Sequence, residues 1–297
     1  MENTVNRSGF IAIVGRPNVG KSTLLNRLVG QKVAIVSQRP QTTRNRILGV
    51  LTEEDCQMVF LDTPGLHRPH NKLGDFMVRQ AERAVRDVDM TVLMVEPSER
   101  VEGIETEVLR LCEGPVLLAI NKIDTVRKDA LLGVIAAYAK AYDFAALLPI
   151  SARTGEGVEV LKQELIARLP EGPAFFPADM STDQTERQLL AEFVREKALR
   201  NLDQEVPHGI AVEIEQFCQH EDGLLEVGAL IYCEKNSHKG IIIGAGGERL
   251  KHIASSARVD MERLMGCKVY LSVFVKVREN WRDSARMLRS FGYREGS

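Results

Sequence analysis

The chain has 297 residues, of which 44% are hydrophobic and 27% charged, and its formal net charge is −2. This composition is that of a globular protein and excludes a disordered chain, a collagen and a coiled coil. At roughly 150 residues per domain, the length predicts two domains. The five cysteines form no C-x-x-C pair and no disulfide or zinc framework, and no apolar run could span a bilayer, so we expect a cytoplasmic protein.

Short apolar runs alternate with amphipathic stretches through the first 170 residues. The runs are rich in aliphatic residues and cover 10–14, 56–61, 90–95, 116–120 and 146–150. Strands of this kind are buried on both faces, as in a parallel sheet covered by helices. Crossover helices are expected at 20–29, 72–86, 103–112 and 158–169. The pattern predicts an α/β domain over residues 1–170, with a mostly parallel sheet and helices on both faces.

A proline-rich linker is predicted at residues 171–183, before an α+β domain at 184–297. Thr182 is expected to precede a helix that has Glu186 at a capping position and ends near Leu202. The elements expected after it are a strand hairpin over 210–219 and 224–234, a glycine-rich turn at 244–247, a long helix to Met265, a strand at 268–277 and a last helix from Asn280.

Charge is divided unevenly within this second half. Residues 181–234 contain four basic and twelve acidic residues, whereas residues 235–297 contain thirteen basic and six acidic residues. A solvated face explains such a run as well as a binding surface does, so charge alone leaves the partner open.

A P-loop pattern, G-x-x-x-x-G-K-[ST], directly follows the first apolar run and opens a helix. It consists of Gly15, Arg16, Pro17, Asn18, Val19, Gly20, Lys21 and Ser22. Backbone N–H groups of such a loop close around phosphate oxygens at the helix N-terminus. Lys21 is therefore expected to reach the β- and γ-phosphates of a nucleotide, and the Ser22 hydroxyl to ligate Mg²⁺.

Three further motifs follow later apolar runs in chain order. Asp62, Thr63, Pro64 and Gly65 form D-x-x-G, which places a carboxylate beside the Mg²⁺ and an N–H group near the γ-phosphate. Asn121, Lys122, Ile123 and Asp124 come next, and the Asp124 carboxylate can accept two hydrogen bonds from guanine that adenine cannot donate. Ser151, Ala152 and Arg153 are expected to bring a backbone N–H group near the guanine O6 atom.

In this order the motifs resemble those of the translation-factor-related GTPases. The resemblance implies that Thr43, with Thr42 as the alternative, is the residue of the first switch that ligates Mg²⁺ when the γ-phosphate is present. It also implies that Lys21, Thr43, Asp62 and Gly65 are the catalytic residues. Leu66 stands where Ras-like enzymes carry a catalytic glutamine, so slow intrinsic hydrolysis of GTP is expected. Asn18 resembles the asparagine that binds an activating K⁺ in several relatives.

A second resemblance concerns the glycine-rich turn of the C-terminal domain. Ile243, Gly244, Ala245, Gly246 and Gly247 contain a G-x-x-G, with two paired strands before it and a long helix and a strand after it. This order resembles a type II KH domain, whose G-x-x-G turn clamps the backbone of single-stranded RNA. RNA is therefore expected at residues 243–247, where Arg249 and Lys251 supply the charge that the turn itself lacks.

A GTPase domain joined to a type II KH domain resembles the Era family of bacterial GTPases over almost the whole chain. The resemblance implies a monomeric ribosome-assembly GTPase whose partners are GTP or GDP, the 3′ end of 16S rRNA and the 30S subunit. The basic last helix, with Arg282, Arg286 and Arg289, permits peripheral contact with the inner membrane. A membrane-associated GTPase switch that does not bind RNA is the alternative function. Trp281 is expected to pack in the core rather than stack on a base.

Overall fold

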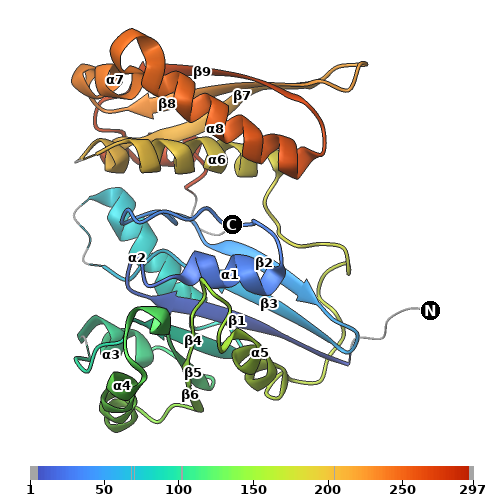
Figure 1. Cartoon of the computed structure of the whole chain (residues 1–297), viewed down its shortest axis with the longest axis vertical. Coiled ribbons are helices and arrows are strands. Elements are labelled where there is room, and N and C mark those ends of the chain that lie inside the picture. Colours follow the sequence, from blue (N-terminus) through green and yellow to red (C-terminus); the bar gives the residue numbers. More distant parts are fainter. Residues whose placement is uncertain (1–5, 68, 70, 102, 204, 294–297) are drawn as a thin grey trace. The chain divides into compact units, whose positions relative to one another are not determined.

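The computed structural model describes residues 6–67, 69, 71–101, 103–203 and 205–293, which form two compact units (Figure 1). The first unit comprises Met1–Ala34, Thr43–Pro69 and Met77–Asp183. The second unit comprises Gln184–Ser297 together with two segments from the N-terminal half, Ile35–Thr42 and His70–Phe76.

The first unit is built on a six-stranded sheet in the order β2-β3-β1-β4-β5-β6. Neighbouring strands are parallel, except that β2 is antiparallel to β3. This confirms the predicted α/β fold with a mostly parallel sheet. The strands are β1 (Arg7–Gly15), β2 (Ile47–Thr52), β3 (Cys56–Asp62), β4 (Met90–Val95), β5 (Val116–Ile120) and β6 (Ala146–Pro149).

Helices cover both faces of this sheet, because alternate strand residues face opposite sides. Ile11 and Ile13 of β1 pack in one core with α1 (Lys21–Val29) and α5 (Val158–Ile166). Ala12 and Val14 pack in the other core, to which three helices contribute (Figure 1). These helices are α2 (Lys72–Ala84), α3 (Gly103–Leu109) and α4 (Lys128–Ala141). Strand β2 and helix α4 had no counterpart among the elements predicted from the sequence.

The second unit has a three-stranded sheet in the order β7-β8-β9, with β7 antiparallel and β9 parallel to β8. Helices α6 and α8 contribute to one buried core with these strands. The elements are α6 (Glu186–Asn201), β7 (Ala211–Gln219), β8 (Leu225–Cys233), α7 (Asn236–Ile243), α8 (Glu248–Met265), β9 (Val269–Val277) and α9 (Ala285–Ser290). The order α-β-β-α-α-β agrees with the predicted type II KH domain.

The predicted start of α6 is wrong. Thr185, not Thr182, is its N-cap, and the Thr185 hydroxyl accepts a hydrogen bond from the Gln188 N–H. Gln188 in turn accepts one from the Thr185 N–H at 2.8 Å, which completes a capping box. Thr182 instead forms a β-bridge with Gly49 in the first unit, which holds it in extended backbone.

The predicted last helix also begins later than expected. Asn280 has φ = 51°, which an α-helix does not allow, and residues 281–283 form a short 3₁₀ turn. Helix α9 begins at Ala285 with Ser284 as its N-cap. Arg282 therefore lies outside α9, and its guanidinium pairs with the Glu234 carboxylate at 2.5 Å.

Trp281 is fully buried and donates a hydrogen bond from Nε1 to the Gly209 carbonyl at 2.9 Å, which confirms its packing role. The cysteines all carry free thiols. In the described part of the chain, no helix is both long enough and apolar enough to cross a membrane.

Candidate functional site

The P-loop joins β1 to α1, and two glycines determine its path. Gly15 has φ = +150°, and a Cβ atom there would lie 2.3 Å from the Met94 carbonyl oxygen. Gly20, with φ = +110°, is the N-cap of α1 and provides no side chain to bond the first N–H groups of the helix. These N–H groups and the positive end of the helix dipole are suited to phosphate oxygens.

Lys21 is folded into this loop. Its Nζ donates hydrogen bonds to the carbonyl oxygens of Gly15 and Arg16, each at 3.0 Å, and the residue is only 6% exposed. Burial lowers the pKa of Lys21 to about 8, and the negative charge of Asp62 opposes that shift. The loop thus holds a cation at the position predicted to meet the phosphates.

Three oxygen-bearing side chains from separate segments converge beside Lys21. The Ser22 hydroxyl lies 2.9 Å from the Thr43 hydroxyl and donates to Asp62 Oδ2 at 2.6 Å, and Thr43 Oγ1 lies 3.4 Å from the same carboxylate oxygen. Asp62 is fully buried, which raises its pKa to about 6 against the opposing effects of Lys21, Ser22 and Thr43.

This oxygen cluster has the chemistry of an Mg²⁺ site. Adjacent ligands of an octahedral Mg²⁺ ion, at about 2.05 Å from the metal, lie ~2.9 Å apart, which matches the spacing of the Ser22 and Thr43 hydroxyls. Asp62 Oδ1 is buried and has no hydrogen-bond partner among the described residues. A buried carboxylate oxygen without a partner is costly, and a hydrated cation would satisfy it. The residues therefore fit the predicted metal.

The two candidate threonines of the first switch have different surroundings. Thr43 lies in the oxygen cluster, whereas the Thr42 hydroxyl donates to the Arg39 carbonyl at 2.6 Å within the second unit. Of the pair that sequence reasoning left open, Thr43 is the one that the fold brings to Ser22 and Asp62.

The D-x-x-G segment lies directly against the P-loop. A Cβ atom at Gly65 would be 2.7 Å from the backbone of Pro17, so only glycine fits there without a shift. The Leu66 N–H donates to the Gly15 carbonyl at 3.0 Å, and the Leu66 side chain is buried in the core that contains Ala12 and Val14. Residue 66 therefore contributes packing at the position of the Ras-like glutamine.

The Asn121 side chain links the P-loop to the segment that begins at Ser151 through two hydrogen bonds. Its Nδ2 donates to the Val19 carbonyl at 2.6 Å, and its Oδ1 accepts from the Ala152 N–H at 2.8 Å. The Ser151 N–H donates to the Glu156 carbonyl at 2.8 Å. Two backbone N–H groups of the segment predicted to face guanine O6 are thus already bonded within the protein.

Asp124 and Ser151 are brought together as predicted, and Arg153 joins them. Asp124 Oδ1 accepts from Ser151 Oγ at 2.6 Å, and Oδ2 accepts from Arg153 Nη2 at 2.5 Å. The Ser151 hydrogen bond, aided by Arg153, lowers the pKa of Asp124 and keeps its carboxylate ionised. Lys122 instead forms an ion pair with Glu96, at the end of β4. Arg153 was predicted only as part of the backbone segment near guanine O6, and the contact of its side chain with Asp124 was not predicted.

The glycine-rich turn between α7 and α8 is open. Gly244, Gly246 and Gly247 all have positive φ, and a Cβ atom added at Gly246 or Gly247 would meet nothing within 4 Å. Gly247 is the N-cap of α8 and provides no side-chain hydrogen bond to the helix. The N–H groups of Gly244 and Gly247 donate to the carbonyls of Gly240 and Gly244, at 2.9 and 3.2 Å. The exposed residues Ala245 and Gly246 between them are therefore where a phosphate could approach the backbone.

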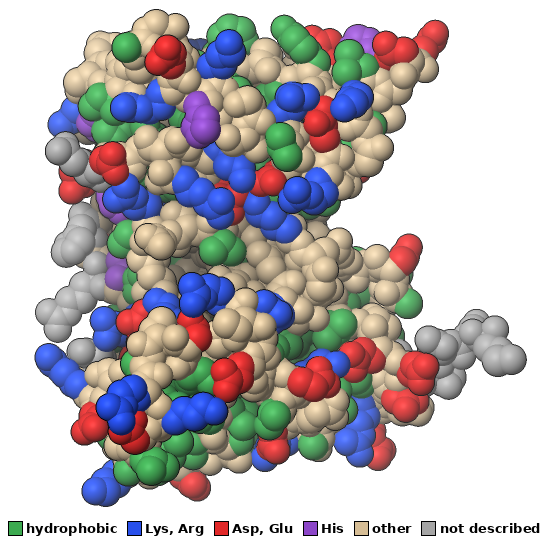
Figure 2. Space-filling model, in the orientation of Figure 1, with side chains coloured by type: hydrophobic (Ala, Val, Ile, Leu, Met, Phe, Trp, Pro, Cys, Tyr) green, Lys and Arg blue, Asp and Glu red, His purple; other side chains and the backbone are tan. Residues whose placement is uncertain are grey.

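The predicted charges beside the turn differ in their contacts. Arg249 Nη1 donates to the Ile241 carbonyl at 2.6 Å near the end of α7, whereas Lys251 is exposed. Ile243 is partly buried against the core of the second unit. Lys and Arg side chains lie over α7 and α8 on the face shown in Figure 2.

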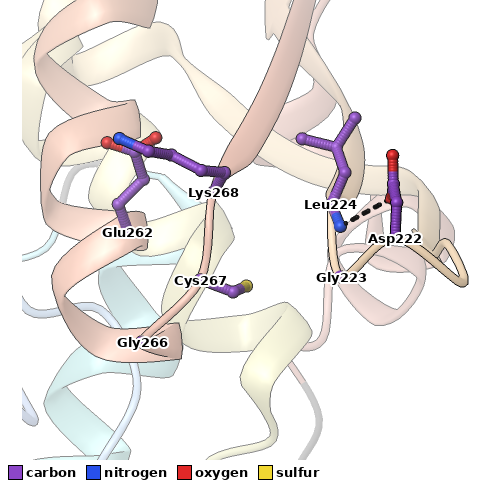
Figure 3. Close-up of a pocket in the computed structure, with 7 residues that line it drawn as sticks. All are labelled: Asp222, Gly223, Leu224, Glu262, Gly266, Cys267 and Lys268. Atoms are coloured by element: carbon purple, nitrogen blue, oxygen red, sulfur yellow. Dashed lines mark hydrogen bonds between the residues drawn. The ribbon is translucent and has the colours of Figure 1, made fainter.

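An open depression of about 730 Å³ lies at the other end of α8 (Figure 3). One wall is the hairpin loop of β7 and β8, where the Leu224 N–H donates to Asp222 Oδ1 at 2.9 Å. The other wall contains Glu262, Gly266, Cys267 and Lys268. A helix of 18 residues is about 27 Å long, so this depression is separate from the G-x-x-G turn.

Comparisons with known proteins agree with both halves of this description. Residues 10–122 match the family described as 50S ribosome-binding GTPase, and residues 205–282 match the KH domain family. GTPase Era of Ruminiclostridium cellulolyticum is 48% identical over 291 residues, which cover 97% of this chain and 98% of that protein. GTPase Era of Clostridium novyi is 49% identical over 292 residues, with 97% and 99% covered.

Two solved structures are similar over almost their full length. A crystal structure of a variant of Aquifex aeolicus Era bound to GDP.AlF4- is 38% identical, with a TM-score of 0.93 and coverage of 97% of this chain and 100% of that one. A structure of Era with MgGDPNP and nucleotides 1506–1542 of 16S ribosomal RNA is also 38% identical, with a TM-score of 0.94 and coverage of 98% and 100%. With a P-loop domain and a KH domain in the same order and nearly half of its residues in common with the curated relatives, the chain belongs to the Era family of GTPases.

Proposed function

We propose that this protein hydrolyses GTP in its P-loop domain, binds the single-stranded 3′ end of 16S rRNA through its KH domain, and acts in assembly of the 30S subunit. The observation that carries the proposal is the full-length similarity to an Era structure that holds MgGDPNP together with nucleotides 1506–1542 of 16S ribosomal RNA. The exposed turn at residues 244–247 supports the RNA part, because a KH domain clamps the RNA backbone at this turn.

In the nucleotide site, we assign the Mg²⁺ to the hydroxyls of Ser22 and Thr43, with Asp62 holding its water shell. Bound there, the metal neutralises charge that develops on the phosphates. Lys21 donates to the β- and γ-phosphates, the Gly65 N–H to the γ-phosphate, and Asp124 selects guanine. No polar side chain at position 66 orients the attacking water, so the intrinsic rate is slow.

The matched pair Thr43→Ala and Thr42→Ala tests the metal assignment. Thr43→Ala removes a hydroxyl from the oxygen cluster, and we expect Mg²⁺-dependent turnover of GTP to fall at least about tenfold, the effect of losing one interaction with a charged group. Thr42→Ala removes only the bond to the Arg39 carbonyl and should keep turnover within about threefold. Equal rates for the two variants would refute the assignment.

A double substitution in the turn tests the RNA site. Ala245→Asp with Gly246→Asp places two carboxylates where RNA phosphates are proposed, and like-charge repulsion should weaken binding more than about tenfold. Ala245→Asn with Gly246→Asn is the control, because asparagine has the same shape, carries no charge and tolerates the positive φ of residue 246.

Fluorescence anisotropy with an oligonucleotide of the 16S rRNA 3′ end measures the RNA affinity of the wild type and of both variants. Wild-type affinity should fall steeply with salt, because phosphate neutralisation releases counterions. Intrinsic hydrolysis of GTP should survive in both variants. If the Asp and Asn variants bind the oligonucleotide equally well, the turn does not hold the RNA.

We also propose that Asn18 ligates an activating K⁺ ion. Asn18 lies in the P-loop with φ = 64°, a conformation that asparagine tolerates. Its place in the middle of the P-loop pattern, at residues 15–22, supports its assignment as the K⁺ ligand. Replacing K⁺ by Na⁺ should slow GTP turnover in the native protein but leave the turnover rate of Asn18→Ala nearly unchanged. Equal rates of the native protein in the two salts would remove K⁺ from the proposal and leave GTP hydrolysis intact.

We further propose that the domains span residues 1–170 and 184–297, with a linker at 171–183. We also propose that the protein is a monomer and makes peripheral contact with the inner membrane. The membrane proposal concerns the exposed basic residues of α9, Arg286 and Arg289. Co-sedimentation with anionic vesicles tests it, and Arg286→Glu with Arg289→Glu should abolish binding. The sedimentation coefficient of the protein in solution gives its oligomeric state.

A further inference from the structure

Of the backbone N–H groups at residues 151–153, that of Arg153 has no hydrogen-bond partner in the described part of the chain. The Ser151 N–H donates to the Glu156 carbonyl at 2.8 Å. The Ala152 N–H donates to Asn121 Oδ1, also at 2.8 Å. The segment predicted to face guanine O6 therefore has one backbone donor available for the base, and it belongs to Arg153.

Arg27, in the last turn of α1, binds the peptide group that carries this N–H. Its Nε donates to the Ala152 carbonyl at 2.7 Å, and its Nη2 donates to the Arg153 carbonyl at 2.5 Å. A peptide group is planar and trans, so its C=O and N–H point in opposite directions. By holding the Ala152 carbonyl, Arg27 therefore also sets the direction of the Arg153 N–H, while its second bond holds the next peptide group.

We propose that Arg27 is a positioning residue for guanine, because it directs the Arg153 N–H to the O6 atom of the base. This inference rests on the proposed guanine site at Asp124. A charged donor on the carbonyl also polarises the peptide group, which makes its N–H a stronger hydrogen-bond donor. Guanine has an acceptor at this ring position, whereas adenine has an amine that the N–H repels. Arg27 thus adds to the base selectivity that Asp124 provides.

The segment lies where a donor to O6 has to be. In guanine, O6 is on the carbon next to N1, so the group that meets O6 must be close to the carboxylate that meets the N1–H. Asp124 accepts hydrogen bonds from the Ser151 hydroxyl at 2.6 Å and from the Arg153 guanidinium at 2.5 Å. Both residues flank Ala152, so the peptide group held by Arg27 lies next to this carboxylate.

The surroundings of Arg27 point to the same role. Gly155 has φ = +96°, and a Cβ atom there would lie 2.8 Å from Arg27 Nη1, so glycine leaves room for the guanidinium. Arg27 is exposed, and among the described residues it donates only to the carbonyls of Ala152 and Arg153. Its contribution is therefore the link from α1, the helix that begins at the P-loop, to the segment that reads the base.

Three variants of the full-length chain test the proposal. Arg27→Met removes both bonds, and the protein should still fold because the residue is exposed. Arg27→Lys keeps the charge and one group that can donate to the Ala152 carbonyl. Arg168→Met is the matched control, because Arg168 also donates to two backbone carbonyls, of Glu164 at 2.7 Å and of Ala145 at 3.2 Å, outside residues 151–153.

Affinities for three nucleoside diphosphates separate the contacts to the base. The 6-thio analogue of GDP carries sulfur, a weak acceptor, in place of O6 and keeps the two donors that Asp124 is proposed to bind. Inosine diphosphate keeps O6 but lacks the amine. The preference for GDP over the 6-thio analogue therefore reports the contact to O6. The preference for GDP over inosine diphosphate reports the contact to Asp124.

We expect Arg27→Met to reduce the preference for GDP over the 6-thio analogue about three- to tenfold, the effect of losing one hydrogen bond between uncharged groups. Its preference for GDP over inosine diphosphate should change less than about twofold. Arg27→Lys should restore part of the lost preference, and Arg168→Met should keep both preferences. The kcat for GTP should stay within about twofold in all three variants, because the phosphate contacts are unchanged.

Two results would overturn the role of Arg27. One is an unchanged preference for GDP over the 6-thio analogue in Arg27→Met. The other is an equal loss of both preferences in that variant, which indicates general loosening of the base site. Asp124→Asn should reduce the preference for GDP over inosine diphosphate. If it does not, the guanine site of the proposed function fails, and the role of Arg27 fails with it.

Discussion

Replacing Asp124 by asparagine should change which base the protein prefers. The carboxylate is ionised and its side chain is 13% exposed, with one oxygen bonded to Ser151 and the other to Arg153. Arg153 is 78% exposed, so it can move aside when guanine approaches. Guanine then donates two hydrogen bonds to the carboxylate, whereas asparagine offers one acceptor and one donor.

The size of the effect follows from the loss of one hydrogen bond to a charged group. Such a bond is worth about 1.5–3 kcal/mol, so GTP affinity should fall roughly 10- to 100-fold. Xanthosine triphosphate carries a carbonyl in place of the guanine amine, and the side-chain amide of the Asp124→Asn variant can donate to that oxygen. The affinity for xanthosine triphosphate should therefore rise in the variant.

Competition of GTP and xanthosine triphosphate against a fluorescent nucleotide measures both changes. Because hydrogen bonds lower the pKa of Asp124, the wild-type carboxylate stays ionised through the neutral range, and the ratio of wild-type to variant affinity should not vary with pH there. Arg153→Met is the control and should leave GTP affinity within about threefold, since Arg153 competes with the base. Unchanged GTP binding in Asp124→Asn would refute the assignment.

Leu66→Ala should cost about 2–5 kcal/mol of unfolding free energy, because the side chain is buried, yet leave turnover measurable where the protein is folded. Gly65→Ala should impair GTP hydrolysis more than GDP binding, since the new Cβ would lie 2.7 Å from Pro17. Trp281→Phe should lower the free energy of unfolding by at least about 1–3 kcal/mol, because the Gly209 carbonyl loses its donor.

Each of these predictions has a clear contrary result. Loss of turnover in folded Leu66→Ala would give residue 66 a catalytic role. Wild-type hydrolysis in Gly65→Ala would mean that the D-x-x-G segment moves away from the P-loop during turnover. A urea denaturation midpoint unchanged in Trp281→Phe would show that the hydrogen bond contributes nothing to stability.

The sequence by itself determined the fold class, both domain types and the chain order of the nucleotide motifs. These features are local: a P-loop needs its glycines, lysine and serine within eight residues, and buried parallel strands appear as short apolar runs. The same locality explains why the G-x-x-G turn and the long helix after it were recognisable. The wrong N-cap of α6 was a misreading of a local signal, because Thr185 has Gln188 three residues later and forms the capping box, whereas Thr182 has no such partner and bridges to Gly49.

Only the tertiary structure decided how distant residues share one site. It placed Thr43 rather than Thr42 beside Ser22, and it paired the backbone N–H of Ala152 with the Asn121 side chain. It also packed residues 35–42 on α6. The bond from Arg195 to Thr42 joins residues 153 positions apart. Such a contact leaves no periodic or spacing signal in a single sequence, because it depends on how whole elements pack and on which buried charges then need partners.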